Sequence, residues 1–232
     1  MAITIRSVKG TPLTHTELDN NFIDLRDGVN LMVPSDTTKG LKVDSTGTPS
    51  FGWHDIHGVP LFDSSDPETP TLATYRGTVK QVQFAEGNQL AINMHMPHDY
   101  LMGSDVYVHV HWSHNSTIVT GGSVTWAFET MFSKGFNQEG FGAPKTVSIV
   151  SSASTTQYQH MVHETALSIT GGSGTQLDSD DLEVDGVFIT RLYLDSNDIT
   201  TSGGTVNPFV HFVDIHYQST GVPTKNKAPT FW

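Results

Sequence analysis

The sequence contains no cysteine, which excludes disulfide bonds and thiolate metal sites. Charged residues are also scarce, at 16%, and 12 Lys and Arg face 24 Asp and Glu, so the net charge is −12. A chain this acidic repels phosphate backbones and anionic lipid surfaces. We therefore expect no nucleic-acid partner and no membrane partner.

Long apolar runs are missing as well. No stretch approaches the roughly 18 apolar residues of a membrane-spanning helix. Residues 1–6 lack the basic region and long apolar run of a secretory signal. We expect a soluble protein made in a cytoplasm, and 232 residues suffice for one large β domain with a short accessory segment.

Alternating apolar residues and turn residues are abundant from about residue 76 onward. The alternation predicts strands, with 21 Gly and 11 Pro in the chain supplying turns between them. The expected strands cover residues 78–84, 89–95, 105–114, 124–132, 145–150, 157–169, 186–195 and 209–219. The first two are expected to form a hairpin around residues 86–88. About eight strands at this spacing predict an all-β fold, an antiparallel β-sandwich of jelly-roll type.

Residues 1–30 differ from the rest and predict a short strand-helix arm. Thr14 is a helix N-cap candidate, with Glu17 completing a capping box. Three apolar side chains then share one helical face: Leu18, Phe22 and Leu25. Because so short a helix is marginal alone, we expect this anchoring arm to dock either on its own domain or on a partner protein.

Three further segments complete the predicted organisation. Residues 31–75 are rich in Gly, Pro, Ser and Thr and predict an ordered linker or loop region. Residues 76–220 form the predicted sandwich, and residues 221–232 a C-terminal tail. The tail ends in Phe231 and Trp232, which we expect to dock on a neighbouring subunit or on their own domain.

A pair of histidines lies on the strand predicted at 105–114. Strand alternation places Tyr107, His109 and His111 on one face and a row of valines with Trp112 on the other. Both imidazoles therefore project to the same side. This pattern suits a metal site, a pH-sensitive interface or a polar layer facing water.

The spacing of Gly103, His109 and His111 resembles the opening of the first cupin motif. In cupins two histidines and a downstream Glu hold a divalent metal inside the barrel, so the resemblance implies a metal-dependent enzyme. The Glu position holds Asn115 or Ser116, which supply no anionic oxygen. His211 is the candidate third ligand. The alternative prediction is that His109 and His111 from each of three chains together hold one metal ion on a three-fold axis.

Residues 5–22, IRSVKGTPLTHTELDNNF, resemble the opening segment of many virion proteins of tailed bacteriophages. Residues 97–112 and 213–218 resemble a domain common in phage structural proteins. The resemblance implies a structural component of the virion, synthesised in the host cytoplasm. It implies a homotrimer whose arm and tail dock on other virion proteins, as a capsid decoration or a neck or tail appendage.

A receptor- or glycan-binding tail-fibre module is the main alternative. Trp53 and Tyr100 are its candidates for stacking on sugar faces. The sequence has no Ser-His-Asp nucleophile motif, phosphate-binding Gly loop or dinucleotide fingerprint. We therefore expect no enzymatic activity, and no cofactor other than a divalent metal at His109 and His111.

Overall fold

The computed structural model describes residues 12–16, 18–19, 42–43, 49–50, 52–63 and 65–231, in two units divided after Gly52. In the first unit residues 15–16 and 18–19 are helical, and the Leu18 N–H donates to Thr14 O at 3.0 Å, where the helix was predicted to begin. Strand β1 (Lys42–Val43) pairs with β2 (Pro49–Ser50). Phe22, Leu25 and Trp232 lie outside the described residues. No helix in the described ranges is long and apolar enough to cross a membrane.

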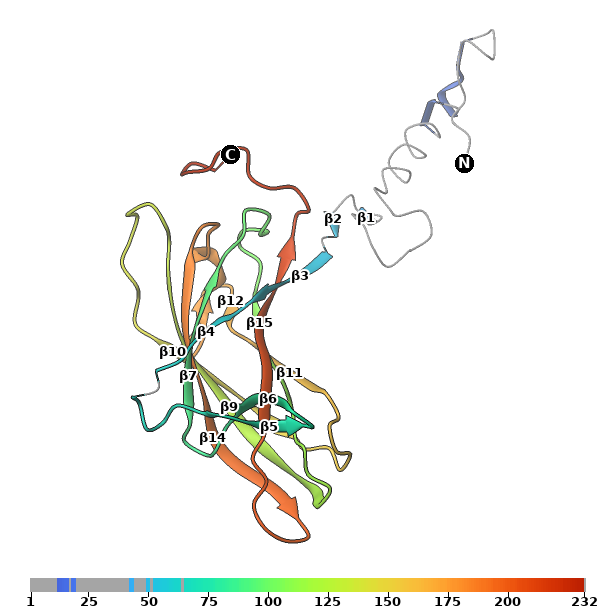
Figure 1. Cartoon of the computed structure of the whole chain (residues 1–232). Coiled ribbons are helices and arrows are strands. Elements are labelled where there is room, and N and C mark those ends of the chain that lie inside the picture. Colours follow the sequence, from blue (N-terminus) through green and yellow to red (C-terminus); the bar gives the residue numbers. More distant parts are fainter. Residues whose placement is uncertain are drawn as a thin grey trace. The chain divides into compact units, whose positions relative to one another are not determined.

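The second unit contains two antiparallel sheets (Figure 1). The five-stranded sheet has the order β10, β9, β14, β7, β4. Its strands span Lys145–Ser152, Val119–Ser133, Val187–Thr201, Gln89–His95 and Val59–Leu61 in that order.

The six-stranded sheet has the order β11, β8, β15, β6, β5, and β3 also pairs with β15. These strands span Met161–Ala166, Tyr107–Ser113, Phe209–Ser219, Val79–Gln83, Thr71–Arg76 and Gly52–His57. A short parallel pair, β12 (Ser168–Ile169) with β13 (Leu177–Asp178), and the 3-10 turn η1 (Ser179–Asp181) connect β11 to β14.

The connectivity is that of a jelly roll, which confirms the predicted fold class. Strands β6, β15, β8 and β11 form one layer and β7, β14, β9 and β10 the other. Among these strands only β9 and β10 are consecutive neighbours in the same sheet. The predicted hairpin of residues 78–84 with 89–95 is therefore wrong: both strands form, but in different sheets. Their connection bonds to β14 instead, since Gly87 N–H donates to Leu194 O at 2.8 Å.

The core lies between the two sheets and follows the predicted alternation. Val108, Val110 and Trp112 of β8 are fully buried, as predicted for this face. The Trp112 ring lies 6.2 Å from that of Trp126 on β9 of the opposite sheet. These side chains remove apolar surface from water on both sheets at once, which is what holds the layers together.

The sandwich begins earlier than the predicted boundary at residue 76, because β3, β4 and β5 are sheet strands. Gly58 is where the chain passes from β3 in one sheet to β4 in the other, and its N–H donates to Val213 O at 2.9 Å. A Cβ at Gly58 would stand 2.3 Å from Ile92 Cγ2. Only glycine fits this crossing without displacing the core.

The C-terminal tail docks on its own sandwich at Phe231, one of the two alternatives predicted for it. Phe231 is 2% exposed and belongs to the core. Its ring lies 5.9 Å from that of His98 and 6.1 Å from that of Phe136. This side chain is therefore not presented to a neighbouring protein.

Candidate functional site

A cluster of histidines and carboxylates lies on the outer face of the six-stranded sheet. Side chains of β8, β11 and β15 that alternate with the core residues meet there. Glu164 of β11 and Asp214 of β15 are both register partners of His109 on β8. We call this set the histidine–carboxylate cluster: Asp55, His57, His109, His111, Glu164, Asp214 and His216. It draws on β3, β8, β11 and β15.

His109 is at the centre of the cluster. It is 3% exposed, and neither ring nitrogen has a hydrogen-bond partner among the described residues. Its Nε2 lies 3.6 Å from Asp214 Oδ2 and 3.7 Å from Asp55 Oδ1. His111 Nε2, which also lacks a hydrogen bond, lies 3.7 Å from the same Asp214 oxygen. Hydrogen bonds to nitrogen span about 2.7–3.2 Å, so these polar atoms converge without bonding one another.

His216 is different because both of its nitrogens are engaged. Nε2 lies 2.7 Å from Asp55 Oδ1 and Nδ1 lies 2.5 Å from Glu164 Oε2. His57 Nδ1 lies 3.3 Å from Asp214 Oδ2. Asp55 and His57 therefore connect β3 to the centre of the sheet through side chains as well as backbone.

Burial controls the charge of the cluster. Desolvation, followed by repulsion from His216 and His111, lowers the pKa of His109 to about 4. Burial also lowers the pKa of His111, although Asp214 opposes that shift. Burial raises the pKa of Asp214, and the facing His111 and His57 rings oppose it. At neutral pH the central imidazole of His109 is uncharged, so it offers a nitrogen lone pair to a cation.

His211, the predicted third ligand, is not part of this cluster. Its Nε2 lies 2.7 Å from Ser113 Oγ and its Nδ1 lies 3.2 Å from Gln81 Nε2. The cause is an irregularity in the pairing of β15 with β8 between Val210 and Phe212, which gives Phe212 the place opposite His111. The prediction that His211 joins His109 and His111 is therefore wrong, and the side chain that faces both imidazoles is Asp214.

The Ser113–His211 pair has the distance of a nucleophile and base but the wrong hydrogen-bond pattern. Gln81 Oε1 accepts from the Val82 N–H at 3.0 Å, so its NH₂ group faces His211 Nδ1 and donates to it. His211 Nε2 then carries the proton and donates to Ser113 Oγ. A base must accept that proton instead, and Ser113 is fully buried.

The cupin interpretation is wrong about the face. A cupin metal lies inside the barrel, whereas here Val108, Val110 and Trp112 fill the interior. His109 and His111 project from the opposite face of β8.

The two predicted glycan-stacking residues differ. Trp53 on β3 is 51% exposed, and its ring lies 5.6 Å from that of Tyr107 at the border of the cluster. Tyr100 is 1% exposed, and its hydroxyl donates to Ser104 O at 2.5 Å. A buried ring has no free face for a sugar, so the prediction for Tyr100 is wrong.

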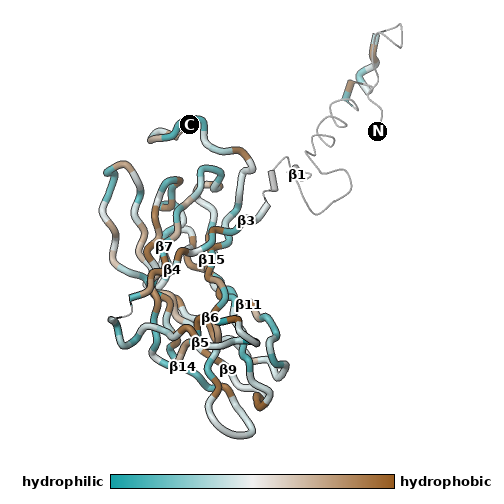
Figure 2. Tube along the Cα trace, viewed as in Figure 1, coloured by the Kyte–Doolittle hydropathy of each residue, from teal (hydrophilic) through white to brown (hydrophobic). Residues whose placement is uncertain are grey.

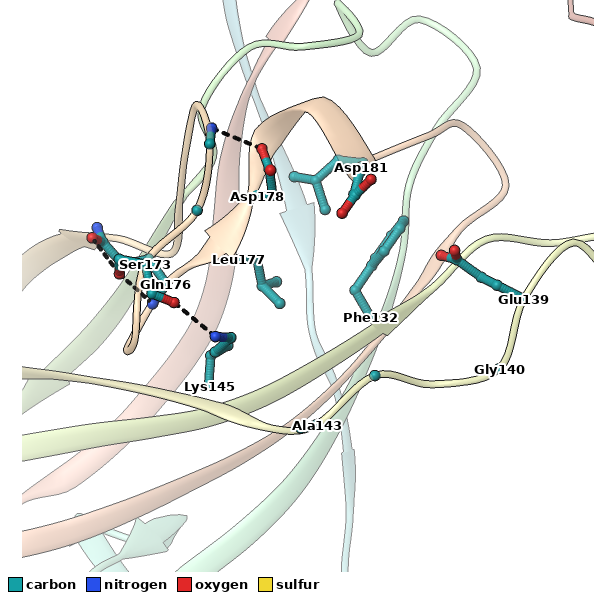
Figure 3. Close-up of a pocket in the computed structure, with 14 residues that line it drawn as sticks. Phe132, Glu139, Gly140, Ala143, Lys145, Ser173, Gln176, Leu177, Asp178 and Asp181 are labelled. Carbon is teal, nitrogen blue, oxygen red and sulfur yellow. Dashed lines mark hydrogen bonds between the residues drawn. The ribbon is translucent and has the colours of Figure 1, made fainter.

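A separate pocket of about 460 Å³ lies where β9 ends and β10 begins, against the β12–β13 segment (Figure 3). Lys145 Nζ donates to Ser173 O at 2.7 Å, and Asp178 Oδ1 accepts from the Gly171 N–H at 2.9 Å. These charged groups brace the loop before β13. None of the residues predicted as a site from the sequence lines this pocket.

The sequence carried a signal for part of the cluster. Asp214 and His216 alternate on their strand as His109 and His111 do, so each pair shares a face. Nothing in the sequence indicated that β15 and β8 are neighbours, or that Asp55 and Glu164 flank them. Those contacts depend on the strand order.

Comparison with known proteins does not assign a family. No family model matches this chain, and no curated protein sequence does. Among solved structures, the chain is similar to a family 11 carbohydrate-binding module from Clostridium thermocellum, in complex with a β-1,3-1,4-mixed-linked tetrasaccharide. The sequence identity is 13% and the TM-score is 0.29, and the match covers 77% of this chain and 94% of that chain. The family 11 module of the C. thermocellum cellulosomal cellulase Lic26A-Cel5E gives 14% identity, 78% and 95% coverage, and a TM-score of 0.29. At these values the likeness carries no inference about function.

Proposed function

We propose that this chain is a structural component of a bacteriophage virion that acts in assembly and catalyses no reaction. Its N-terminal arm docks on a neighbouring virion protein, and the jelly-roll sandwich is the body that the arm attaches. The observation that carries this proposal is the anchoring of β3, the strand that follows residues 1–51. Asp55 and His57 of β3 lie 2.7 Å from His216 Nε2 and 3.3 Å from Asp214 Oδ2.

This arrangement suits assembly better than catalysis. The residues around His109 close over it, so that its ring is buried on the outer face of a sheet. A substrate needs an accessible concave site, whereas the paired side chains here fix β3, the strand that follows the arm in sequence. Phe231 has no part in the proposed docking, because this side chain is buried in its own core.

The edge strands support association between copies as a homotrimer. Val59 and Leu61 on β4 and Leu72 on β5 are exposed, and both strands lie at the edge of their sheet. Figure 2 shows hydrophobic colour along β4 and around β5 and β6. Exposed apolar side chains on an unpaired strand edge are typical of surfaces that another chain covers.

Quantitative mass spectrometry of purified phage particles tests the virion role. We expect this polypeptide at a fixed ratio to the major capsid protein, and its absence from particles would contradict the proposal. Light scattering on the tag-free full-length protein tests the trimer, with a mass of three chains of 25.3 kDa expected. Leu61→Glu should dissociate it, while Val222→Glu, an exposed apolar position on the tail, serves as control.

Glycan binding is a second candidate, favoured by one observation. Trp53 presents an exposed ring supported edge-on by Tyr107. A glycan array probed with wild type and Trp53→Ala tests it: binding lost in the variant supports the candidate, and binding by neither protein contradicts it.

A further inference from the structure

The centre of the histidine–carboxylate cluster has the features of a metal site. His109 is buried, yet both of its nitrogens lack a hydrogen-bond partner among the described residues, as do His111 Nε2 and Asp214 Oδ1. Burying polar atoms without partners costs free energy, and native structures rarely leave several together unless a water or an ion satisfies them. Two of these atoms, His109 Nε2 and His111 Nε2 on β8, approach the same oxygen, Asp214 Oδ2 on the neighbouring strand β15.

The distances match atoms that share a cation. His109 Nε2 and His111 Nε2 lie 3.6 and 3.7 Å from Asp214 Oδ2, and one ligand atom from each residue lies within 4.8 Å of the others. Ligands at about 2.0–2.1 Å from a tetrahedral ion are separated by about 3.3 Å. The two distances from histidine nitrogen to carboxylate oxygen exceed this separation by only a few tenths of an ångström.

We propose that His109, His111 and Asp214 bind one divalent cation of the zinc class. Two imidazole nitrogens with a carboxylate oxygen suit Zn²⁺ or Co²⁺, whereas Ca²⁺ and Mg²⁺ require sites built mainly of oxygen. Asp55 lies beside this site: its Oδ1 is 3.7 Å from His109 Nε2 and 2.7 Å from His216 Nε2.

The surrounding residues orient these ligands. His111 Nδ1 lies 2.8 Å from His160 Nε2. When His111 donates its Nδ1–H to His160, the lone pair at Nε2 is left for the ion, which is the usual arrangement of a metal-ligating histidine. His160 is thus a positioning residue rather than a ligand.

A second combination, Asp55 with His109 and His216, is a weaker site. Asp55 Oδ1 and His216 Nε2 are already 2.7 Å apart, and His216 Nδ1 is taken by Glu164. Atoms in direct contact leave no room for an ion between them. The geometry therefore assigns one ion per chain, at the His109–His111–Asp214 position.

The ion would also help to fix β3, because the proposed ligand Asp214 lies 3.3 Å through its Oδ2 from His57 Nδ1 of β3. This consequence for β3 rests on the proposed anchoring function, whereas ion binding itself rests on the cluster alone. Ion binding and the virion role can fail separately. Metal titration of the isolated protein measures ion binding, and the composition of purified particles measures the virion role.

Calorimetric titration of tag-free, chelator-treated full-length protein with Zn²⁺ tests the proposal, with elemental analysis for stoichiometry. We expect one ion per chain and no comparable binding of Mg²⁺ or Ca²⁺. His111→Ala and Asp214→Asn should weaken binding at least about 100-fold, and His160→Ala by about 10–100-fold, the range of outer-shell partners. His211→Ala is the matched control, since that histidine lies outside the cluster, and should bind as wild type does.

Several results would overturn the proposal: no Zn²⁺ binding, one ion per three chains, equal binding in Asp214→Asn, or equal weakening in His211→Ala. If a variant fails to fold, histidine NMR of the wild-type protein decides instead. Zn²⁺ must then shift the ring signals of His109 and His111, and an unchanged pair of signals would refute the site.

Discussion

The two faces of strand β8 show how differently one alternating pattern can be satisfied. On the inner face Val108, Val110 and Trp112 are buried against the opposite sheet and need nothing but close packing. On the outer face His109 is buried to nearly the same degree, at 3% exposure, but its nitrogens need partners that the described residues do not supply. Close packing thus satisfies the inner face, whereas the outer face has buried nitrogens that the proposed ion would satisfy.

Trp112→Ala should give the largest effect, by breaking the inner face. Removing a fully buried Trp side chain costs about 3–5 kcal/mol, because apolar contacts are lost and a cavity remains. Urea unfolding of the metal-free protein measures it. His111→Ala on the outer face is the comparison and should change the free energy of unfolding by less than about 1 kcal/mol. Equal losses would show that the two faces do not differ.

Zinc should stabilise the native state through the outer face of β8 alone. At a free Zn²⁺ concentration of about 100 times Kd, the native state gains about 2.7 kcal/mol, which thermal unfolding detects as a higher Tm. Asp214→Asn should lose this gain, while Trp112→Ala should keep it if that variant still folds. A rise in Tm of the same size in Asp214→Asn would contradict the assignment.

Gly58→Ala tests the crossing from β3, on the side of the cluster, to the opposite sheet. The added Cβ would meet Ile92 Cγ2 at 2.3 Å and Val213 O at 2.8 Å. Overpacking of this kind costs about 1–3 kcal/mol, as unfolding in urea would show. Gly52→Ala is the control, because nothing lies within 4 Å of a Cβ there. Equal stability of the two variants would mean that the crossing tolerates a side chain.

The smallest expected effect is the loss of stability that protonation of His163 causes as the pH falls. Its Nδ1 accepts a hydrogen bond from the buried Trp112 Nε1–H at 3.3 Å, and burial lowers its pKa. The unfolded state, with a pKa near 6.5, takes up this proton first. The stabilisation by neutral His163 is therefore complete above about pH 6.5 and declines as pH falls toward the lower folded-state pKa.

His163→Asn keeps an acceptor that does not titrate. Its free energy of unfolding, measured in urea at several pH values, should fall less between neutral pH and pH 5 than that of the wild type. Parallel pH profiles of the two proteins would contradict the role given to His163.

Much of the fold could be predicted because strand alternation is local. The predicted strand at 209–219 coincides with β15, and 89–95 coincides with β7. The pairing could not be predicted: β6 and β7 are consecutive in sequence but lie in different sheets. Which strands pair depends on packing across the whole sandwich. A short run of sequence does not contain that information.

The site was predictable in part for the same reason. Alternation placed His109 and His111 together, but identifying the carboxylate that faces them required the register of β15 on β8. The irregularity before Phe212 moves His211 away and sets Asp214 opposite His109. Asp55 lies in a segment predicted as linker. The local sequence does not show that this segment contains a strand paired with β15.

Anomalous X-ray diffraction at the zinc absorption edge, on crystals of the full-length protein grown with Zn²⁺, tests the central claim most directly. We expect one anomalous peak per chain, bonded to His109 Nε2, His111 Nε2 and Asp214. An empty cluster, a peak at Ser113 and His211, or one peak shared by three chains would contradict the claim.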